Sequence, residues 1–546
     1  MAVGMRHSIW LVALTCLASP ALATDVTVQL DAGSGFSVKN STGAIERLRV
    51  DEATGNISRN GTLFVHTTGF ESVFVGRLTG NTSSTGASNT GFGTYTLQNN
   101  TSGGSNSAFG AAAMRANTTG IRNAAFGIYA LESNTSGFSN AAFGAFSLRA
   151  NIGGYYNSAF GEAALIHNTS GSQNTAAGKS ALYANTTSGG NSAFGSLALT
   201  NHTGPNGNNS AFGAFALLSN TTGFYNSAFG QGALQSNKGG WDNTAVGKGA
   251  LYANVSGRYN AAFGQDALRA NLVNNNAAFG QDALTANTTG LANIGVGTLA
   301  LRNNQTGNYN SAVGFSTLSS NVGGSDNTVL GFAAGGAMTG SGNIAIGSRA
   351  GQSQTTGSNN IYLAHAGVAG ESGIIRIGTA GTQTATFVAG ITGTLLAGPN
   401  VTVGADGRLG VAPSSSRFKQ DIEDMGKASD SLMALRPVRF HYREEVAGVH
   451  TEEYGLIAEE VAAVAPELVV YDEKGQPFTV KYQELAPMLL NEMKKQQNTI
   501  DAQRQESQAQ EKEMASQRQE IAALTTRLAQ LESRAGSPAE PKGATR

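Results

Sequence analysis

The stretch NAAFGQDALTANTTGLA, residues 276–292, is one copy of a unit that recurs along about half of the chain. The glycine of its AFG element returns at a spacing of seventeen, apart from one interval of eighteen and two of sixteen. Asn stands four residues before each of these glycines except the first, and Leu stands four residues after most of them. The glycines are residues 76, 93, 110, 127, 144, 161, 178, 195, 213, 230, 247, 264, 280, 297, 314, 331 and 347.

The repeated unit predicts a β-solenoid. A fixed period in this range is typical of coils that bury their apolar side only against neighbouring coils. The NSAFG element alternates like a short strand, and NTTG has turn residues, because Asn and Gly accept left-handed backbone angles. Stacked coils place Asn on Asn, Phe on Phe and Leu on Leu, so the Asn column can form a ladder of amide hydrogen bonds. We therefore expect a mainly β fold, with a repetitive β-solenoid fibre over residues 76–351.

The composition argues against several kinds of site. The chain has 546 residues, 13% of them charged, with a net charge of −1 and no basic run, so it lacks the electrostatic footprint of a nucleic-acid-binding protein. Calcium binding by the repeats would need a recurring Asp, but only Asp242 and Asp326 follow GGW and GGS turns. Residues 76–351 hold just six acidic side chains. We expect no metal site and no cofactor, and we interpret the many Asn-x-Ser/Thr triplets as turns.

The N-terminus has the pattern of a secretory signal peptide. Arg6 and His7 precede an apolar run over residues 9–17, and the tripeptide ALA then predicts cleavage before Thr24. The alternative is a membrane anchor, but an apolar run of about ten residues is too short to span a bilayer of roughly 30 Å. The single cysteine, Cys16, lies in this segment, so the mature chain would have no disulfide. We expect residues 1–23 to be removed and the protein to be secreted or held at the cell surface.

The regions on either side of the repeats are predicted as short strands and turns. Residues 24–75 alternate polar and β-branched residues between Gly and Asn turns, which indicates an N-terminal β region. Over residues 352–413 the period stops, and IIRIG, ATFVAGITG and NVTVGADGRLGVA follow as further strand and turn units. We interpret this second region as a β neck between the solenoid and the tail.

The tail has the composition of an ordinary mixed domain with many charges. Apolar residues recur at helical spacing over residues 417–436, and PVRFHYREE is predicted as a strand. Residues 450–485 are predicted as a strand, a short helix and a hairpin through the turn EKG. A final helix is expected from about Tyr482. These elements predict a small α+β domain over residues 414–490.

Beyond this domain the final helix shows a heptad pattern. The pattern predicts a coiled coil over residues 491–535, of three chains or of two, and the alternative is a single solvated helix. Four consecutive Gln at d weaken the apolar contact but can fix its register through paired amides. Residues 536–546 are expected to fray. The a positions are Met493, Ile500, Ser507, Met514, Ile521 and Leu528, and the d positions are Gln496, Gln503, Gln510, Gln517, Leu524 and Leu531.

The repeats resemble the head repeats of trimeric autotransporter adhesins. Those heads carry N-x-x-A-[IF]-G-x-x-A units and wind as left-handed β-rolls in bundles of three chains. The adhesin units are usually a few residues shorter, and adhesins end in an anchor domain that this tail does not resemble. The resemblance implies a trimeric, adhesin-like fibre.

Four motifs of the tail resemble, in order, those of the endosialidase-type intramolecular chaperone domain. They are SSSRFKQDI, LRPVRFHY, YGLIAEEV and PELVVYDEKGQPFTVKYQELAPMLLNEMKKQ, between residue 414 and about residue 497. That auto-processing module ends phage tail spikes and fibres, and a relative lies within myelin regulatory factor. The resemblance implies a domain that forms a homotrimer, guides folding of the fibre ahead of it and cuts itself off. The family's serine nucleophile precedes its lysine by five residues, which implies Ser414 and Lys419 as the dyad and Pro413–Ser414 as the cleavage site.

A serine–lysine dyad sets chemical conditions on this stretch. The serine needs a base, and a lysine serves only if burial lowers its pKa enough to keep it neutral. Phe418 and Arg417 are the residues expected to desolvate Lys419 and to repel its charge. A spacing of five residues aligns the two side chains on neither a helix nor a strand, so the dyad needs an irregular turn or closure across subunits. The alternative is that Ser415 or Ser416 caps a helix beginning in RFKQDI.

The sequence therefore predicts an exported trimeric fibre that cleaves off its own chaperone. Two residues depart from the family pattern, since Ser415 stands where phage members commonly have Asp or Asn, and Pro413 fixes φ before the scissile bond. The alternative is a fibre, of a bacterial surface or a phage tail, whose C-terminal domain only trimerises. The signal peptide argues against a phage, whose fibres assemble in the cytoplasm. The solenoid's ligand is a glycan, a host surface or nothing at all, and the uniform repeat does not distinguish these alternatives.

Overall fold

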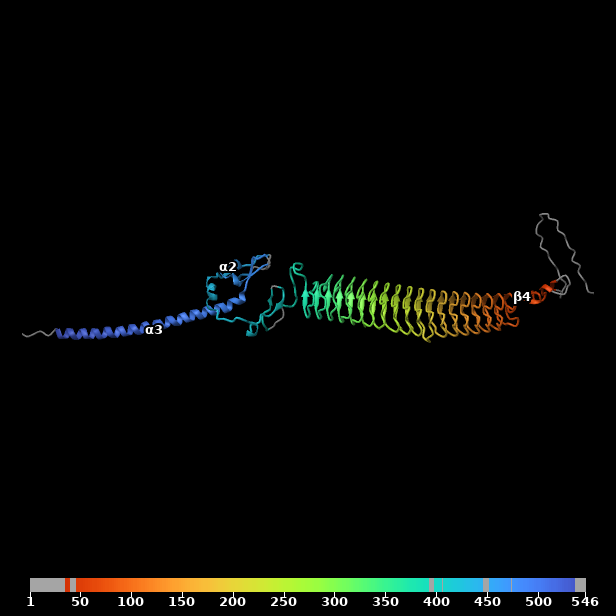
Figure 1. Ribbon diagram of the computed structural model, residues 1–546, viewed down its shortest axis with the longest axis horizontal. Coiled ribbons are helices and arrows are strands. Elements are labelled where there is room, and N and C mark those ends of the chain that lie inside the picture. Colours follow the sequence, from red (N-terminus) through yellow and green to blue (C-terminus); the bar gives the residue numbers. More distant parts are fainter. Residues whose placement is uncertain are drawn as a thin grey trace, which may run out of the picture. The chain divides into compact units, whose positions relative to one another are not determined.

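The computed structural model describes residues 35–39, 46–391, 397–404, 406–444, 451–472 and 474–535. The predicted signal peptide, residues 1–23, and the predicted frayed tail, residues 536–546, lie outside these residues. The chain forms two compact units, Met1–Val388 and Ala389–Arg546, which are described separately. The first consists largely of stacked coils, and the second ends in a long helix (Figure 1).

The first unit begins with short antiparallel strands. β1 (Phe36–Lys39), β2 (Glu46–Val50), β3 (Ile57–Arg59) and β4 (Thr62–His66) pair in sequence order. β4 also pairs antiparallel with β5 (Val73–Val75), and β5 then opens a parallel ladder. The short strands predicted between residues 24 and 75 are therefore present in the described part of that region.

The strands β5 to β23 form one ladder in which each strand pairs parallel with the next. The register places equivalent residues opposite one another, as in Ala211 with Ala228 and Phe212 with Phe229. This confirms the predicted β-solenoid of 17-residue coils, and the ladder runs on past residue 351. The further strands are β6 (Thr90–Phe92), β7 (Ser107–Phe109), β8 (Ala124–Phe126), β9 (Ala141–Phe143), β10 (Ser158–Phe160), β11 (Thr175–Ala177), β12 (Ser192–Phe194), β13 (Ser210–Phe212), β14 (Ser227–Phe229), β15 (Thr244–Val246), β16 (Ala261–Phe263), β17 (Ala277–Phe279), β18 (Ile294–Val296), β19 (Ser311–Val313), β20 (Thr328–Leu330), β21 (Ile344–Ile346), β22 (Ile361–Leu363) and β23 (Ile375–Ile377).

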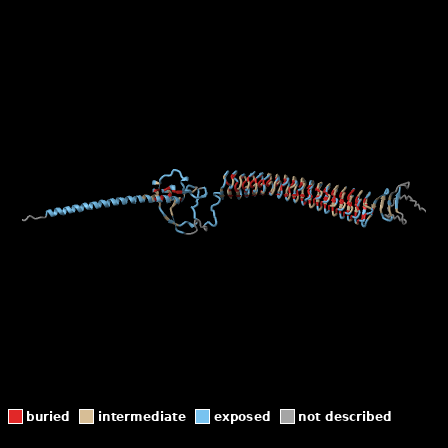
Figure 2. Cartoon of the chain, turned by 90° about the horizontal axis from the view of Figure 1, so that it is seen from below, coloured by how far each residue is buried: buried red, intermediate tan, exposed pale blue. Residues whose placement is uncertain are grey.

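Each coil buries small apolar residues and one leucine. The central Ala of the strand points inward, and a second Ala and the Leu after it fill the rest of the core, as Ala211, Ala216 and Leu217 do. Figure 2 shows these buried residues running along the coils. Because equivalents stack on equivalents, one coil completes its core only against the next.

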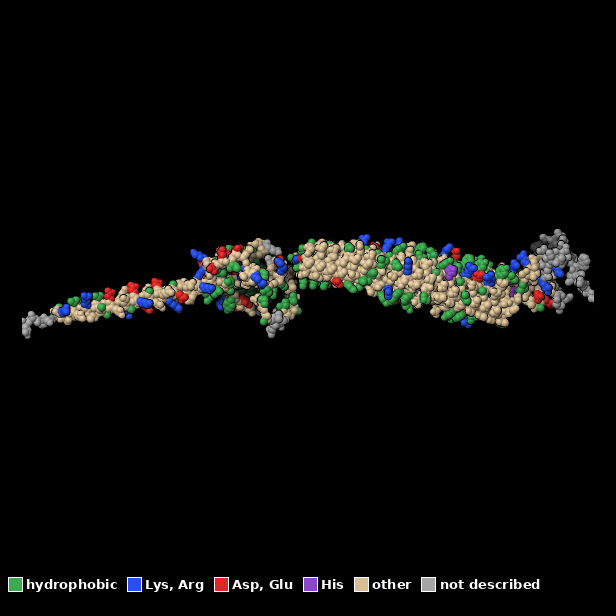
Figure 3. Space-filling model, turned by 60° about the horizontal axis from the view of Figure 1, so that its bottom comes forward, with side chains coloured by type: hydrophobic (Ala, Val, Ile, Leu, Met, Phe, Trp, Pro, Cys, Tyr) green, Lys and Arg blue, Asp and Glu red, His purple; other side chains and the backbone are tan. Residues whose placement is uncertain are grey.

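The strand Phe residues point outward and stack in columns. Ring centroids lie 4.7 Å apart for Phe109 and Phe126 and 4.9 Å apart for Phe212 and Phe229. Phe229 is still 40% exposed. The predicted stacking of Phe on Phe is confirmed, and it lies on the surface, while Ala faces the core. Figure 3 shows hydrophobic side chains gathered along the edges of a solenoid surface that carries few charges.

After each strand the chain makes a turn in which some non-glycine residues have left-handed backbone angles. Phe215 and Leu217 have φ of 63° and 52°, and the Ala216 N–H closes a turn on the Gly213 carbonyl at 3.2 Å. Such angles cost an L-residue about 1–2 kcal/mol each. Burial of the Leu217 side chain offsets this cost, and its N–H bonds the Ala233 carbonyl of the next coil at 3.0 Å. The turns therefore hold the coil to its neighbour.

Two ladders of buried Asn side chains run through the core. In the first, Asn226 Nδ2 donates to Asn209 Oδ1 at 3.2 Å and to the Gly240 carbonyl at 2.9 Å. In the second, built from the Asn of the NTTG turn, Asn304 Nδ2 donates to Asn287 Oδ1 at 2.8 Å. The first ladder confirms the prediction, whereas the sequence analysis interpreted the second Asn only as a turn residue.

The second ladder is interrupted beside each coil whose length departs from the regular repeat. Three of its buried Asn side chains have an Oδ1 atom with no hydrogen-bond partner, and in each case the next coil is an irregular one. An unpaired buried acceptor costs about 1–3 kcal/mol, so these coils are weak points of the ladder. They are Asn185 before the long coil 195–213, Asn254 before the short coil 264–280 and Asn321 before the short coil 331–347.

The long coil 195–213 is expected to lose stability in acid. His202, fully buried, takes the Asn position there, and its Nδ1 lies 3.2 Å from the donor Asn220 Nδ2. Burial lowers the pKa of His202 below its ordinary value of 6.5. The unfolded state therefore binds the proton more readily just below pH 6.5, and stability falls as the pH falls through that value.

This expectation is checked by amide hydrogen exchange of coil 195–213 as a function of pH, in the wild type and in His202→Asn. The wild-type coil should open more readily on acidification, and His202→Asn should remove that local dependence. His66 and His365, whose pKa values burial also lowers, remain in both proteins, so only the difference between the two is interpreted. Equal acid sensitivity of the two proteins in this coil would contradict the assignment.

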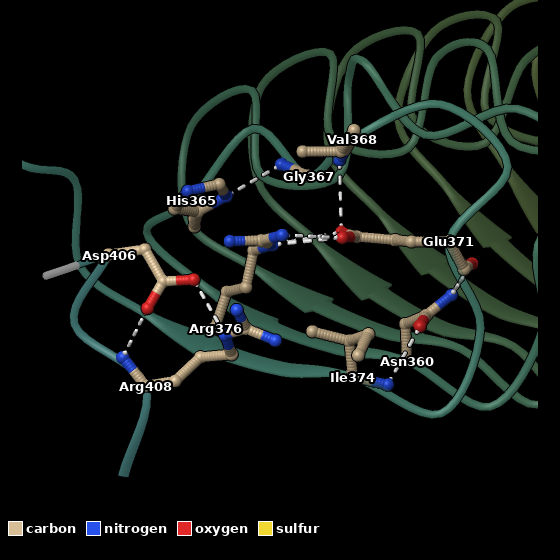
Figure 4. Close-up of polar contacts among 9 residues, drawn as sticks. All are labelled: Asn360, His365, Gly367, Val368, Glu371, Ile374, Arg376, Asp406 and Arg408. Atoms are coloured by element: carbon tan, nitrogen blue, oxygen red, sulfur yellow. Dashed lines mark hydrogen bonds and ion pairs between the residues drawn. The ribbon is translucent and has the colours of Figure 1, made fainter. Parts of the chain in front are cut away.

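Polar contacts close the last coils of the solenoid (Figure 4). Glu371 pairs with Arg376 at 2.7 Å and accepts the Val368 N–H at 3.0 Å. Asn360 Oδ1 accepts the Ile374 N–H at 3.0 Å. The Arg376 guanidinium holds the pKa of the Glu371 carboxyl below its usual range. These contacts satisfy polar groups at the end of the parallel ladder.

The second unit combines a small α+β part with a long helix. Three antiparallel pairs are β24 (Thr402–Val403) with β25 (Leu409–Gly410), β26 (Val438–Phe440) with β27 (Glu453–Gly455), and β28 (Val469–Tyr471) with β29 (Pro477–Val480). The helices are α2 (Ala458–Val464), α3 (Tyr482–Ala535) and the 3₁₀ helices η1 (Ser416–Phe418), η2 (Gly426–Ala434) and η3 (Pro466–Leu468). The predicted strand, short helix, hairpin and final helix are confirmed.

The segment 417–436 differs from its prediction. Its helical spacing indicated one helix, but the structure has two 3₁₀ helices, η1 and η2. Asp421 and Gly426 both have φ of 51°, a left-handed angle that a continuous helix cannot contain. The apolar spacing is still used, because Leu432 enters a small core with Val461 and Met488.

Candidate functional site

The predicted dyad lies in an exposed stretch at the start of η1. Ser414 and Lys419 are both exposed, and within the described residues no hydrogen bond joins them. Ser415 is the N-cap of η1 and accepts the Arg417 N–H at 3.3 Å, which confirms the capping alternative for that serine. Lys419 is the C-cap, in an extended conformation. In one chain the two predicted catalytic side chains are therefore both open to solvent and not joined by a hydrogen bond.

The side chains expected to desolvate Lys419 are themselves open to solvent. The Arg417 guanidinium lies 5.3 Å from the Phe418 ring centroid, but that ring is 66% exposed. Ile422 is 67% exposed. A lysine acts as a base only when it is desolvated. One chain alone does not provide that desolvation, and the exposed apolar residues beside the lysine leave room for a neighbouring surface to do so.

A different serine and lysine are in contact in this unit. Ser429 is fully buried on η2, and its hydroxyl donates to Glu492 Oε1 at 2.5 Å. It accepts from Asn491 Nδ2 at 2.6 Å and from Lys495 Nζ at 3.2 Å. Lys495 also pairs with Asp430 at 2.5 Å and with Glu492 at 2.6 Å. These contacts fasten η2 onto the start of α3.

The charges around this cluster favour the protonated form of its lysine, which is not the form that acts as a base. Asp430, and after it Glu492, raise the pKa of Lys495, so the amine is held in its charged form. Lys495, and after it Ser429, lower the pKa of Glu492. A protonated lysine cannot take a proton from a serine hydroxyl. The sequence analysis missed this cluster, although Asn491, Glu492 and Lys495 recur at helical spacing on one face of α3.

An apolar groove opens beside the cluster. It has a volume of about 540 Å³ and is lined by η2, by β26 and β27, and by α3. Leu485 and Leu489 of α3 line it, and Leu489 stands one heptad before the d position Gln496. One side chain in the heptad register of α3, Leu489, therefore lines the groove.

Residues 414–470 match a family model described as chaperone of endosialidase. The match begins at the predicted nucleophile and confirms the resemblance of the C-terminal domain to that family. Fold and match together describe a class of protein: a repetitive β-solenoid followed by a C-terminal domain similar to the chaperone of endosialidase. That family implies homotrimeric assembly. No curated protein and no solved structure matches the chain.

Two further properties of the described residues concern membranes and metals. Among these residues, no helix is long and apolar enough to cross a membrane. In that same part of the chain, no three His, Cys, Asp or Glu side chains are grouped so that they could hold a metal ion.

Proposed function

We propose that the protein is an exported homotrimeric fibre whose C-terminal domain drives trimerisation and folding and then cleaves itself off. Ser414 is the nucleophile and Lys419 the base. Cleavage between Pro413 and Ser414 releases the whole of residues 414–546 as one fragment. A fibre that has lost its chaperone cannot refold but unfolds very slowly, which is kinetic stability.

The reaction needs only the residues of this stretch and water. Neutral Lys419 takes the hydroxyl proton as Ser414 Oγ attacks the Pro413 carbonyl carbon. The C–N bond breaks, the lysine returns the proton to the Ser414 amine, and an ester joins the two residues. Water then hydrolyses the ester, which leaves the Pro413 carboxylate and the free serine.

The observation that carries the proposal is the exposure of α3. Over its 54 residues only Met488 is buried, although apolar side chains recur at heptad positions. Such a helix is stable in water when copies of it bury these side chains together. The match of residues 414–470 to a trimer-forming chaperone family supports three copies. The exposed heptad residues are Met493, Ile500, Met514, Ile521, Leu524, Leu528 and Leu531.

Assembly supplies what the isolated stretch lacks. Lys419 and Phe418 are exposed in one chain, and a neighbouring copy packed against them would desolvate the lysine, as a neutral base requires. Cleavage would then follow trimerisation, because the base forms only in the trimer. This order protects an unassembled chain from losing its chaperone.

A second candidate is a fibre that keeps its chaperone domain. Two observations favour it: Ser415 serves as a helix cap, and Ser414 and Lys419 are both exposed with no hydrogen bond between them. In this case the domain acts only as a folding and trimerisation module, and the protein is structural or adhesive. The mass of the expressed chain separates the two candidates.

Trimerisation is tested by placing a charged side chain at an a position of the predicted coiled coil. Ile521→Asp puts a carboxylate at an a position, which is expected to dissociate the trimer or prevent its formation. Ser516→Asp adds the same charge off the a and d positions and is the control. Analytical ultracentrifugation of both, in a Ser414→Ala chain that retains α3, should give a monomer for the first and a trimer for the second. If both variants had the same mass, the a and d positions of α3 would not form the contact between copies.

A further inference from the structure

Each coil turns a corner in the one or two residues that precede its Asn of the first ladder. In several successive coils these corner residues are aromatic. The Phe224 and Trp241 rings stack with centroids 5.6 Å apart and planes 5° apart. The Arg258 guanidinium lies 5.1 Å from the Trp241 centroid, and the Tyr259 ring meets Trp241 edge-on at 4.6 Å. Tyr225 packs edge-on against Phe224 at 5.2 Å. Successive coils thus build an aromatic stack along the surface.

The stack ends abruptly at the long coil 195–213. There the corner position of Phe224 is taken by Gly207, and one coil earlier by Gly189. A Cβ on Gly207 would lie 1.8 Å from the Gly189 carbonyl oxygen, and one on Gly189 would lie 2.6 Å from the Ser172 oxygen. Without a shift of the backbone, no side chain fits at either place. The backbone conformation at these two glycines therefore keeps aromatic side chains out of this corner.

A hollow of about 350 Å³ lies in the space that the rings leave free. Phe224 and Tyr225 form its aromatic wall, Asn206 and Asn208 supply its polar side chains, and Pro205 also lines it. No charged side chain lines it. Since Phe224 stacks on Trp241 in the following coil, its remaining surface borders the hollow.

Buried contacts hold the polar wall in place. Asn220 Nδ2 donates to His202 Nδ1, which leaves the hydrogen of the neutral ring on Nε2. That Nε2 donates to the Asn206 carbonyl at 2.9 Å. The Asn208 N–H donates to the Gly189 carbonyl at 3.3 Å. His202 is therefore a positioning residue for the loop that carries Asn206.

We propose that this hollow binds one neutral pyranose ring of a glycan. An aromatic ring face accepts the C–H face of a sugar, while amide side chains and backbone carbonyls bond its hydroxyl groups. Both kinds of group border this hollow. The lack of a charged lining residue favours an uncharged sugar over a sialylated or phosphorylated one. The site is independent of self-cleavage, and it gives the fibre a defined point of attachment to a carbohydrate surface.

Trp241 provides the readout, because it stacks on the ring that would contact the sugar. The chain's other tryptophan, Trp10, lies in the predicted signal peptide, so Trp241 is the one tryptophan of the mature chain. Tryptophan emission of the mature chain is titrated with lactose, cellobiose and chitobiose as neutral probes and with sialyllactose as the charged one. At least one neutral probe is expected to give a saturable change, with sialyllactose binding more weakly.

Three variants test the location of the site. Phe224→Ala removes the aromatic wall and should weaken binding about tenfold. Asn208→Gly keeps a left-handed position, where Asn208 has φ of 60°, but deletes a polar group of the hollow, and it should also weaken binding. Phe138→Ala is the control, since Phe138 stacks on Tyr155 at 4.9 Å but does not line the hollow. It should bind as the parent chain does.

Several outcomes would overturn the proposal. They are no saturable change with any neutral sugar, equal binding by Phe224→Ala and its parent, and binding of sialyllactose alone. If Phe224→Ala instead lowers the oligomeric mass and no sugar binds, the corner is an interface between copies of the chain. Each of these results is independent of whether Ser414→Ala stops cleavage.

Discussion

Ser414→Ala is expected to yield a single full-length mature chain, whereas the wild type yields two fragments. The hydroxyl is the only nucleophile that the proposed reaction uses, and loss of such a group lowers a rate by about a millionfold. Lys419→Met should also leave the chain whole, because the serine then has no base. Denaturing electrophoresis and intact mass measure both outcomes.

The neighbouring serine supplies the control. Ser416→Ala changes an exposed hydroxyl two residues away and should leave cleavage unchanged. Co-expression of Ser414→Ala with Lys419→Met tests whether the dyad closes between subunits. If it does, Lys419 of the first variant activates Ser414 of the second within a mixed trimer, and some of the Lys419→Met chains are cut. A wild type that stays whole and cannot be told from Ser414→Ala would favour the non-cleaving fibre.

Asn304→Ala is expected to destabilise the solenoid by about 3 kcal/mol. Asn304 is fully buried, and its Nδ2 donates to Asn287 Oδ1 and to the Gly307 carbonyl at 2.8 and 3.0 Å. Its Oδ1 accepts from Asn321 Nδ2 at 2.8 Å. Alanine leaves Asn287 Oδ1 unpaired in the core and removes one of the two acceptors of Asn321 Nδ2, while the Gly307 carbonyl keeps Asn293 Nδ2 as a donor at 2.8 Å. The substitution should also speed opening of this coil, measured by hydrogen exchange or by the rate of proteolysis.

The adjacent residue gives a matched comparison. Asn303 is exposed, so Asn303→Ala removes the same side chain without touching the ladder. It should change stability by less than about 0.5 kcal/mol. If the two variants opened at the same rate, the second ladder would have no special part in stability.

Periodicity made the solenoid predictable, because a fixed repeat forces equivalent residues into columns. The strand, the first Asn ladder and the stacking of Phe on Phe all followed from that fact. The second ladder did not, since the Asn of NTTG has an equally good local explanation as a turn residue. The left-handed Leu217 was also beyond sequence reasoning, because leucine disfavours that angle and only burial against the next coil offsets it.

The tail was predictable in its elements but not in its contacts. Motif order indicated the chaperone domain, yet the break of segment 417–436 into η1 and η2 depends on left-handed angles at Asp421 and Gly426. The contact of Ser429 with Lys495 joins residues far apart in sequence, and no local pattern links them. The hollow beside Phe224 lies where Gly189 and Gly207 take the ring position, and the sequence marks the place only by these two glycines and by a single longer interval in the repeat. Departures from the repeat, more than the repeat itself, mark the places where function can differ between coils.

The most direct test of a fibre that releases its own chaperone is the intact mass of the purified wild-type protein, with sequencing of each N-terminus. The account predicts a fibre chain that ends at Pro413 and a separate fragment that begins with Ser414 and ends at Arg546. A single uncut mature chain that ends at Arg546, found in an assembled trimer, would contradict it.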